Sequence, residues 1–242
     1  MIHPPIDPRP PVALVTGATE DIGRATAFAL GRAGFALGVT ARTAAKVDDL
    51  LAALRSDGIE AAGIPADVGE PADVERLAAH VAGALGPVHT LVNNAGVLIP
   101  KPFLEQTLDE WDTTFRTNVR SLYLVTRAVL PGMIAAGEGD VVNVASLAGK
   151  NPVRGAAAYS ASKHAVLGLS RTLMLELRHQ GIRVIAVCPG SVDTPMMRGQ
   201  DTLNPKLDRI LKPEDVAAAV LSALQLPRRA TPSEIDIRPS DP

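Results

Sequence analysis

A tyrosine and a lysine stand four residues apart in the segment Tyr159-Ser160-Ala161-Ser162-Lys163. Residues at i and i+4 of a helix lie on the same face, so the ammonium of Lys163 can approach the phenol of Tyr159. A nearby positive charge favours the ionised phenol, which should lower the pKa of Tyr159 from its ordinary value of about 10. Proton transfer works best when that pKa lies near the working pH. The spacing therefore indicates acid–base chemistry, and the alternative is a surface Tyr and Lys that fall four apart by chance.

A glycine-containing turn from Thr16 to Gly23 is a second candidate feature, and it directly follows a short apolar run. A strand, a tight glycine turn and a helix start would bring backbone N–H groups to the positive end of a helix, where a pyrophosphate can bind. The spacing does not match the G-x-G-x-x-G dinucleotide fingerprint. Taken alone, an ordinary turn between a strand and a helix explains it about as well.

The composition favours small-molecule chemistry. The chain has 242 residues, of which 46% are hydrophobic, so it can bury one sizeable core. A formal charge of -2 and the lack of any long Lys or Arg run give no electrostatic footprint for nucleic acid or an anionic membrane. The single Cys188 rules out an internal disulfide and is expected to be a small buried hydrophobe, and no residue cluster resembles a metal site.

The chain start and the apolar runs indicate where the protein resides. Residues 1–11 are Pro-rich and lack the basic and apolar regions of a secretory signal, so we expect a flexible N-terminal arm. We find no apolar run long enough to cross a bilayer. The expectation is a cytoplasmic protein without nucleic-acid or membrane partners.

Short apolar runs alternate with amphipathic stretches along the chain, which is typical of an α/β fold. Strands are predicted at Val12 to Thr16, Phe35 to Ala41, Ile59 to Ala66, Val88 to Asn93, Asp140 to Ser146 and Ile182 to Cys188, with a last one at Glu234 to Ile237. Helices are predicted at Ile22 to Ala33, Thr43 to Asp57, Pro71 to Leu85, Asn118 to Ala136 and Ala157 to Gln180, with another starting near Pro213.

This alternation predicts one Rossmann-type domain over residues 12–242, a doubly wound parallel sheet flanked by helices on both faces. Right-handed crossovers place the carboxyl ends of the strands at one edge, where ligands of open α/β sheets bind. Gly17, Asn93, Ser146 and Pro189 all stand at or just after predicted strand ends. The candidate residues should therefore meet at that edge.

With these motifs in order, the chain closely resembles the short-chain dehydrogenase/reductase family, in its compact single-domain branch, from Val12 to about Val220. Thr16-Gly17-x-x-x-Asp21-Ile22-Gly23 is similar to the family's TGxxxGxG cofactor turn, and Asn93-Asn94-Ala95-Gly96 to its NNAG segment. The segment from Pro189 to Thr194 is similar to its PG segment beside the nicotinamide. Asn118, Ser146, Tyr159 and Lys163 match its catalytic tetrad.

The resemblance implies hydride exchange between a nicotinamide cofactor and a ketone, aldehyde or alcohol. Tyr159 would then be the general acid and base, Ser146 would orient the substrate oxygen, Lys163 would hold the ribose, and Asn118 would keep a water relay in place. The cofactor-binding residues it implies are Thr16, Gly17, Thr19, Asp21, Ile22, Gly23, Arg42, Asp67, Val68, Asn94, Ala95, Gly96, Tyr159, Lys163, Pro189, Gly190, Val192 and Thr194.

Asp21 departs from the family pattern, which usually has Gly at that point. A carboxylate near a pyrophosphate repels it unless the side chain turns away. Asp can cap a helix and tolerates unusual backbone angles, and Arg24 nearby would offset its charge. We expect Asp21 to be tolerated, and a large rise in cofactor affinity for Asp21→Gly would contradict this.

The end of the second strand bears on cofactor choice, because an acidic residue there holds the ribose of NAD whereas an Arg accepts the 2′-phosphate of NADP. The chain has Ala41 followed by Arg42. NADP(H) is therefore favoured, NAD(H) is possible, and the alternative for Arg42 is a solvated loop residue. Asp67 is either an adenine-contacting residue or a cap of the next helix.

The substrate pocket is expected to be apolar, with a short lid near residues 194–212, or a mobile surface loop there without that duty. Its predicted walls are Leu98, Leu147, Ala148, Val153, Val192 and the stretch from Met196 to Lys212.

Two other functions stay open. One is a 3-oxoacyl-carrier-protein reductase, which is weakened because the segments Ala135 to Glu138 and His179 to Gln180 lack basic residues. The other is a non-catalytic NADP-sensing regulator, against which the intact tetrad argues. Because the helices from Asn118 and Ala157 are apolar on more than one side, and such helices pair in relatives, we expect a homodimer or homotetramer.

Overall fold

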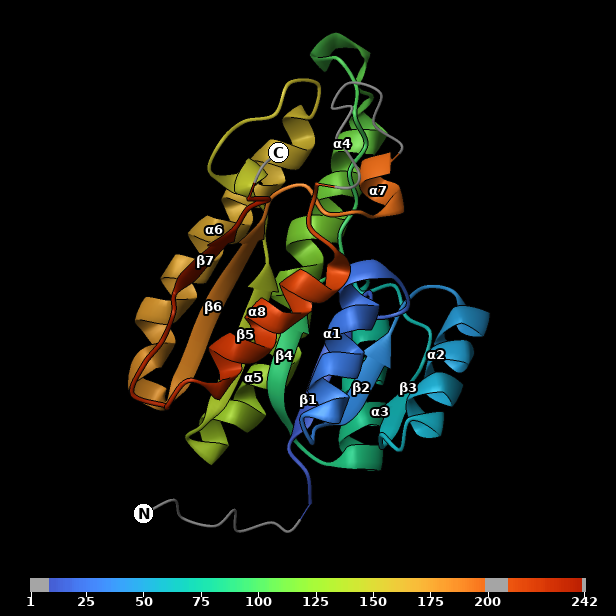
Figure 1. Ribbon diagram of the computed structural model, residues 1–242, viewed down its shortest axis with the longest axis vertical. Helices are drawn as coiled ribbons and strands as arrows, with labels where there is room; N and C mark the ends of the chain where they lie inside the picture. The colour runs from blue at the N-terminus through green and yellow to red at the C-terminus, as the bar shows by residue number, and fades with distance from the viewer. Residues whose placement is uncertain (1–8, 199–208, 241–242) are drawn as a thin grey trace.

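One parallel sheet forms the centre of the molecule in the computed structural model, which describes residues 9–198 and 209–240 (Figure 1). Its seven strands run in the order β3-β2-β1-β4-β5-β6-β7, and every adjacent pair is parallel. The strands are β1 (Val12–Thr16), β2 (Ala36–Thr40), β3 (Ala61–Gly63), β4 (Val88–Asn93), β5 (Gly139–Val144), β6 (Ile182–Pro189) and β7 (Glu234–Ile237).

Helices cover both faces of this sheet, as the alternation of elements predicts (Figure 1). One face carries α1 (Asp21–Arg32), α2 (Ala44–Ser56) and α8 (Pro213–Gln225). The other carries α3 (Pro71–Leu85), α5 (Ser121–Ala136) and α6 (Ala157–Leu177). Two shorter helices, α4 (Leu108–Phe115) and α7 (Pro195–Arg198), lie near the carboxyl edge of the sheet. The strands from β1 to β6 are almost entirely buried because helices cover both sides, which explains their continuous apolar runs, whereas the edge strand β7 is only partly buried.

The predicted strands and helices are all present, with differences at their ends. The third strand is short, Ala61–Gly63, because the chain turns away at Ile64 and Pro65. The helix predicted from Asn118 begins earlier, because α4, a π-helical turn (Arg116–Arg120) and α5 form one continuous helical stretch. Sequence periodicity missed α4, although Thr107 and Glu110 form a capping box that marks its start.

That continuous stretch, Leu108–Ala136, corrects one expectation. It has 29 residues and a mean hydropathy of 1.2 in its most apolar window, enough by length and composition to cross a membrane. Core helices of soluble proteins can have the same length and composition. In this structure α5 packs against β4 and α3.

The last strand, β7, extends the sheet beside β6 and is followed by residues that return to the carboxyl edge. A buried ion-pair network holds the chain that leads into it. Arg183 of β6 donates to both oxygens of Asp140 in β5, at 2.6 and 3.1 Å, and Arg228 donates to the same carboxylate at 2.8 Å. The segment before β7 is thereby fixed to the edge of the sheet at which β5 and β6 begin.

Candidate active site

A cavity of about 830 Å³ opens at the carboxyl edge of the sheet. It lies where the strand order reverses, between β1 and β4, which is the position expected for a ligand of an open α/β sheet. Its wall comes from the turn after β1, the ends of β2 and β3, and the segments that follow β4, β5, β6 and β7. The topology thus gathers predicted residues from almost the whole chain.

Asn94 joins the two strands on either side of the reversal. Its backbone N–H and that of Ala95 donate to Thr16 Oγ1 at 3.0 and 3.1 Å. Its side-chain Nδ2 donates to the carbonyl oxygens of Thr16 and Gly17 at 3.2 and 3.0 Å. Asn94 and Ala95 line the cavity, whereas Thr16 is buried behind its wall. Thr16 therefore acts on the site by holding the loop after β4.

Two glycines fix the turn after β1. Gly17 has a left-handed backbone, φ 61°, and a Cβ there would lie 3.0 Å from the Cα of Ala95. A Cβ on Gly23 would lie 2.1 Å from the Gly17 carbonyl oxygen. Gly17, Thr19, Asp21 and Ile22 line the cavity, while Gly23 lies behind it and lets α1 approach the turn.

Asp21 is the only non-glycine residue with a left-handed backbone in the described part of the chain, φ 49°. The expectation of an unusual backbone angle is confirmed, but the helix-cap role is wrong, because Glu20 takes the N-cap position without a side-chain cap. Burial and the neighbouring Glu20 raise the pKa of Asp21, which Arg198 and Lys46 partly offset.

Arg24 does not perform the compensating role that we expected of it. Its guanidinium lies over the ring of Phe28 at 5.2 Å, and the cations acting on Asp21 are Arg198 and Lys46.

Ser146, Tyr159 and Lys163 line the cavity together. Ser146 follows β5, and its hydroxyl accepts a hydrogen bond from the Ala148 N–H at 3.1 Å. Tyr159 and Lys163 lie on α6, with the Lys163 Nζ 5.7 Å from the centre of the Tyr159 ring. The i, i+4 geometry predicted from the sequence is therefore present, and a serine hydroxyl and a phenol face one space.

The protonation of this pair differs from the prediction. Burial raises the pKa of Tyr159 above its ordinary value, although a hydrogen bond with Ser146 opposes the change. Burial also lowers the pKa of Lys163 to about 8, and its ammonium donates to the Val144 carbonyl oxygen at 2.9 Å. The prediction that Lys163 lowers the Tyr159 pKa is therefore wrong for this structure, because loss of water disfavours both charged forms.

Asn118 is buried behind this group, in the π-helical turn between α4 and α5. Its Oδ1 accepts a hydrogen bond from the Val97 N–H at 2.8 Å, and its Nδ2 donates to the Val97 carbonyl oxygen at 2.9 Å and to Ser162 Oγ at 3.0 Å. Asn118 does not line the cavity, but it ties α6 to the loop after β4. Asn118 lies inside a continuous helical stretch, so its side chain does not cap a helix end.

Basic residues gather at the opposite end of the cavity. Arg42 lines it with an exposed side chain, and Lys46 lines it while forming an ion pair with Glu20 at 2.5 Å. Asp67 and Val68 also line the cavity. The Asp67 carboxylate accepts a hydrogen bond from the Gly69 N–H and does not cap α3, because the N-cap residue of α3 is Glu70.

The segment after β6 contributes Pro189, Gly190, Val192 and Thr194 to the cavity. Residues 199–208 of the predicted lid lie outside the described residues. The base of that segment is fixed, because Asp193 N donates to the Leu211 carbonyl oxygen at 2.7 Å. The predicted apolar walls Leu98, Leu147, Ala148, Val153, Val192 and Met196 all line the cavity, whereas Leu211 and Lys212 do not.

Several lining residues were not predicted, notably Lys46, Thr117, Arg238 and Pro239. Arg238 directly follows β7, so the rule that strand carboxyl ends meet at one edge could have identified it. Cys188 is buried as expected, and burial raises the pKa of its thiol to about 11, so it is not a nucleophile here. Within the described ranges, no three His, Cys, Asp or Glu residues group as a metal site.

The close approach of Gly23 to Gly17 predicts that Gly23→Ala disrupts the turn. The added Cβ would meet backbone at 2.1 Å, so α1 or the turn must shift, and we expect a loss of stability of about 2 kcal/mol or more in urea unfolding. Gly83→Ala in α3 is the matched control, since nothing lies within 4 Å of that Cβ. Equal stability of the two variants would contradict the packing explanation.

The raised pKa of Asp21 predicts a pH-dependent effect of Asp21→Asn, which removes the charge and still tolerates a left-handed backbone. A folded-state pKa above the unfolded value gives stability that is present in acid and lost as pH rises through the folded pKa. Thermal unfolding should therefore show Asp21→Asn to be more stable than the parent at neutral pH, with the difference shrinking in acid. Asp48→Asn, at an exposed position of α2, is the control for loss of a carboxylate.

Known proteins share the sequence pattern and the fold of this chain. The short chain dehydrogenase family profile matches residues 11–204. A putative ketoacyl reductase of Streptomyces coelicolor is 45% identical over 187 residues, 76% of this chain and 72% of its own length. A tryptophan variant of actinorhodin polyketide ketoreductase, solved with NADPH, superposes with a TM-score of 0.89 at 36% identity, over 95% of this chain and 96% of that one. A metagenomic short-chain oxidoreductase in complex with NADP gives 0.83 at 35% identity, over 95% and 97%. The chain belongs to the short-chain dehydrogenase family of oxidoreductases.

Proposed function

We propose that this protein is an NADP(H)-dependent oxidoreductase that interconverts a ketone or aldehyde with an alcohol. The observation that carries the proposal is the meeting of Ser146, Tyr159 and Lys163 at one end of a cavity whose other end holds the glycine turn and Arg42. Hydroxyl donors at one end and a phosphate-binding turn with a basic residue at the other suit a carbonyl and a dinucleotide, respectively.

The cavity fits a dinucleotide at the turn after β1. Gly17 presents no side chain there and Gly96 presents none in the loop after β4, and α1 begins at the cavity wall, where the free N–H groups of a helix start can bind phosphate. When bound, the nicotinamide supplies or accepts the hydride. Arg42 offers a planar guanidinium suited to the 2′-phosphate of NADP, and the compared structures were solved with NADPH and NADP.

Tyr159 would give its proton to the carbonyl oxygen during reduction and take it back during oxidation. The raised pKa keeps the phenol protonated at neutral pH, the form needed in the reducing direction. Ser146 would hold the same oxygen, where negative charge develops. Lys163 would hold the ribose, while Asn118 would keep α6 and the loop after β4 in register.

A second candidate is a 3-oxoacyl-carrier-protein reductase, favoured by the similarity to a putative ketoacyl reductase and to actinorhodin polyketide ketoreductase. Basic residues for an acidic carrier are absent from Ala135 to Glu138 and from His179 to Gln180. A non-catalytic NADP sensor is the third candidate, and the assembled catalytic group argues against it.

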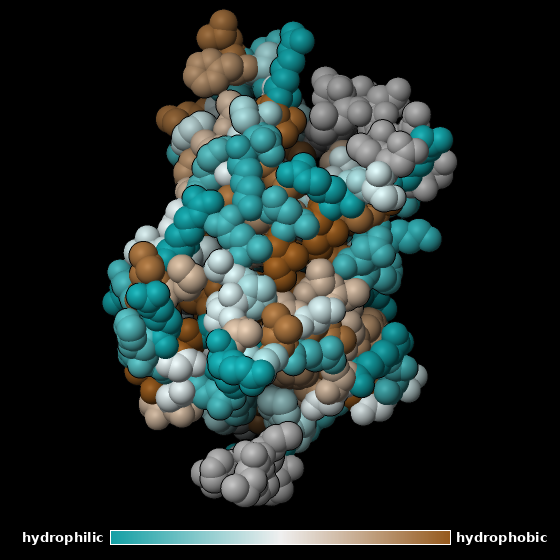
Figure 2. Space-filling view, turned by 60° about the vertical axis from the view of Figure 1, so that its left-hand side comes forward, coloured by the Kyte–Doolittle hydropathy of each residue, from teal (hydrophilic) through white to brown (hydrophobic). Residues whose placement is uncertain are grey.

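We also propose a cytoplasmic homodimer or homotetramer. Hydrophobic side chains project at the tip of the molecule that carries the loop after β4 (Figure 2). Phe103 and Leu104 are 73% and 95% exposed, and Tyr123 of α5 is 47% exposed. A second subunit would remove such groups from water.

Tyr159→Phe tests the proposed catalysis. Loss of the phenolic proton should lower kcat/KM by about a hundredfold or more, because a donor at the developing charge is worth several kcal/mol. Initial rates of NADPH oxidation over a panel of ketones, aldehydes and 3-oxoacyl thioesters measure this, and NADPH fluorescence measures cofactor binding. Tight NADPH binding with no turnover of any compound would favour the sensor.

Arg42→Asp tests the cofactor preference. A carboxylate at this position should repel the 2′-phosphate of NADP and accept a hydrogen bond from a ribose hydroxyl of NAD. The ratio of kcat/KM for NADPH to kcat/KM for NADH should therefore fall at least about tenfold. Arg229→Asp is the control, because that exposed Arg lies outside the cavity. A parent enzyme that prefers NADH would overturn the role given to Arg42.

A further inference from the structure

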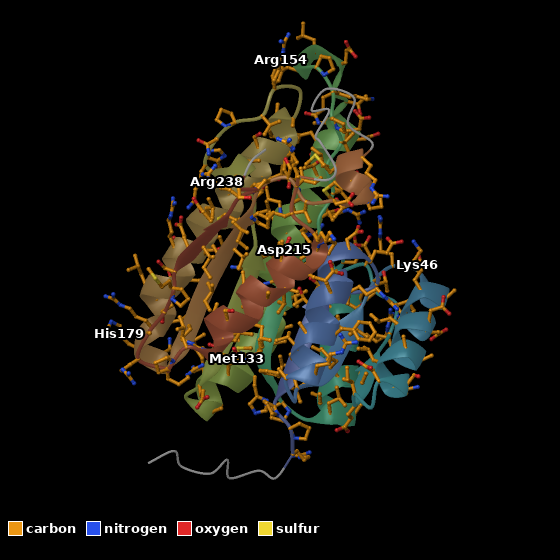
Figure 3. All side chains as sticks on the ribbon, in the orientation of Figure 1. Lys46, Met133, Arg154, His179, Asp215 and Arg238 are labelled. Carbon is orange, nitrogen blue, oxygen red and sulfur yellow. The ribbon has the colours of Figure 1, made fainter. Side chains whose placement is uncertain are left out.

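Arg238 introduces a positive charge into the cavity from the C-terminal segment. It follows β7, and Figure 3 places it at the opposite side of the molecule from Lys46. The other charged lining residues in the described chain are Lys163 and a group from the turn after β1, the ends of β2 and β3, and α2, namely Glu20, Asp21, Arg42, Lys46 and Asp67. Arg238 thus stands apart from the proposed dinucleotide end.

The backbone around Arg238 is held close to the catalytic serine. Gly190 N donates to the Ile237 carbonyl oxygen at 2.8 Å. A Cβ on Gly190 would lie 3.3 Å from both Pro239 Cδ and Leu147 Cδ1, and Leu147 directly follows Ser146. The segment therefore forms part of the wall beside the position proposed for the carbonyl.

The neighbouring ion pairs leave Arg238 weakly compensated. Lys150 Nζ lies 2.6 Å from Asp236 and 2.8 Å from Glu234, and Arg171 lies 2.6 Å from Glu234. Arg238 Nη2 lies 3.6 Å from Asp236, beyond hydrogen-bond length. Three cations, Lys150, Arg171 and Arg238, thus face two carboxylates, Glu234 and Asp236. Arg238 has the longest of these contacts, and of the three cations it is the one that lines the cavity.

We propose that Arg238 binds an anionic group of the carbonyl substrate, a carboxylate or a phosphate, and so selects charged substrates over neutral ones. This inference rests on the proposed function. The guanidinium fork matches both anions, and its side chain, 57% exposed, is reachable from solvent. The apolar wall formed by Leu98, Val153 and Met196 would hold the chain that links this group to the carbonyl.

Matched substrate pairs test the proposal and identify the source of the anion. One arm compares 2-, 3-, 4- and 5-oxo acids with their methyl esters, and the other compares 3-oxobutyryl pantetheine with its 4′-phosphate, all at saturating NADPH. In at least one arm we expect the charged member to have about a tenfold higher kcat/KM, mainly through KM, and the preference to weaken at high salt.

Three variants separate recognition from fold. Arg238→Gln should abolish the preference for the charged member and Arg238→Lys should keep part of it. Arg171→Gln removes the same charge from the same ion-pair cluster, but it does not line the cavity and should keep the full preference.

Equal use of charged and neutral members in both arms, or a preference that survives Arg238→Gln, would overturn the proposal. Turnover of the methyl esters or of neutral ketones by the parent enzyme would still support the proposed function in that case. Failure of the parent enzyme to reduce any compound would instead count against the proposed function.

Discussion

The hydrogen bonds of Asn94 to the end of β1 are the interaction on which the site depends. They join residues 78 apart in sequence, across the point where the sheet reverses its strand order. Parallel strands leave free backbone groups at this edge, and Asn94 satisfies two carbonyl oxygens of the glycine turn there. The same residue therefore fixes the turn after β1 and the loop after β4, which form adjoining walls of the cavity.

Burial controls the protonation of Tyr159 and Lys163 more than their spacing does. Tyr159 and Lys163 are one helical turn apart, yet removal from water shifts each towards its neutral form. The Lys163 ammonium donates a hydrogen bond to the Val144 carbonyl oxygen, and the Asn118 side-chain amide donates hydrogen bonds to the Val97 carbonyl oxygen and to Ser162 Oγ. These contacts hold α6, β5 and the loop after β4 together, so the geometry of the proposed acid is set by side chains around it.

The cavity also separates charge along its length. Asp21 occupies a left-handed position in the glycine turn, with Lys46 and Arg198 as the cations that offset it. At the other end, Arg238 lines a wall that is otherwise largely apolar. A ligand that fills the whole cavity thus meets a basic and acidic surface at one end, and Lys163 and Arg238 beside the hydroxyls at the other.

The sequence by itself determined the layout of this protein. Alternating apolar and amphipathic runs predicted the parallel sheet and its helices, because strands covered on both faces must be apolar throughout. The rule that strand ends share one edge then predicted that Gly17, Ser146 and the residues near them would meet, and they line one cavity. The tertiary structure decided which predicted residues face it: Thr16 and Asn118 support it from behind. It also decided which cations offset the charge of Asp21, in which direction the pKa of Tyr159 shifts, and that Arg238 lines the cavity. These depend on solvent exclusion and on contacts between distant segments, which local periodicity does not encode.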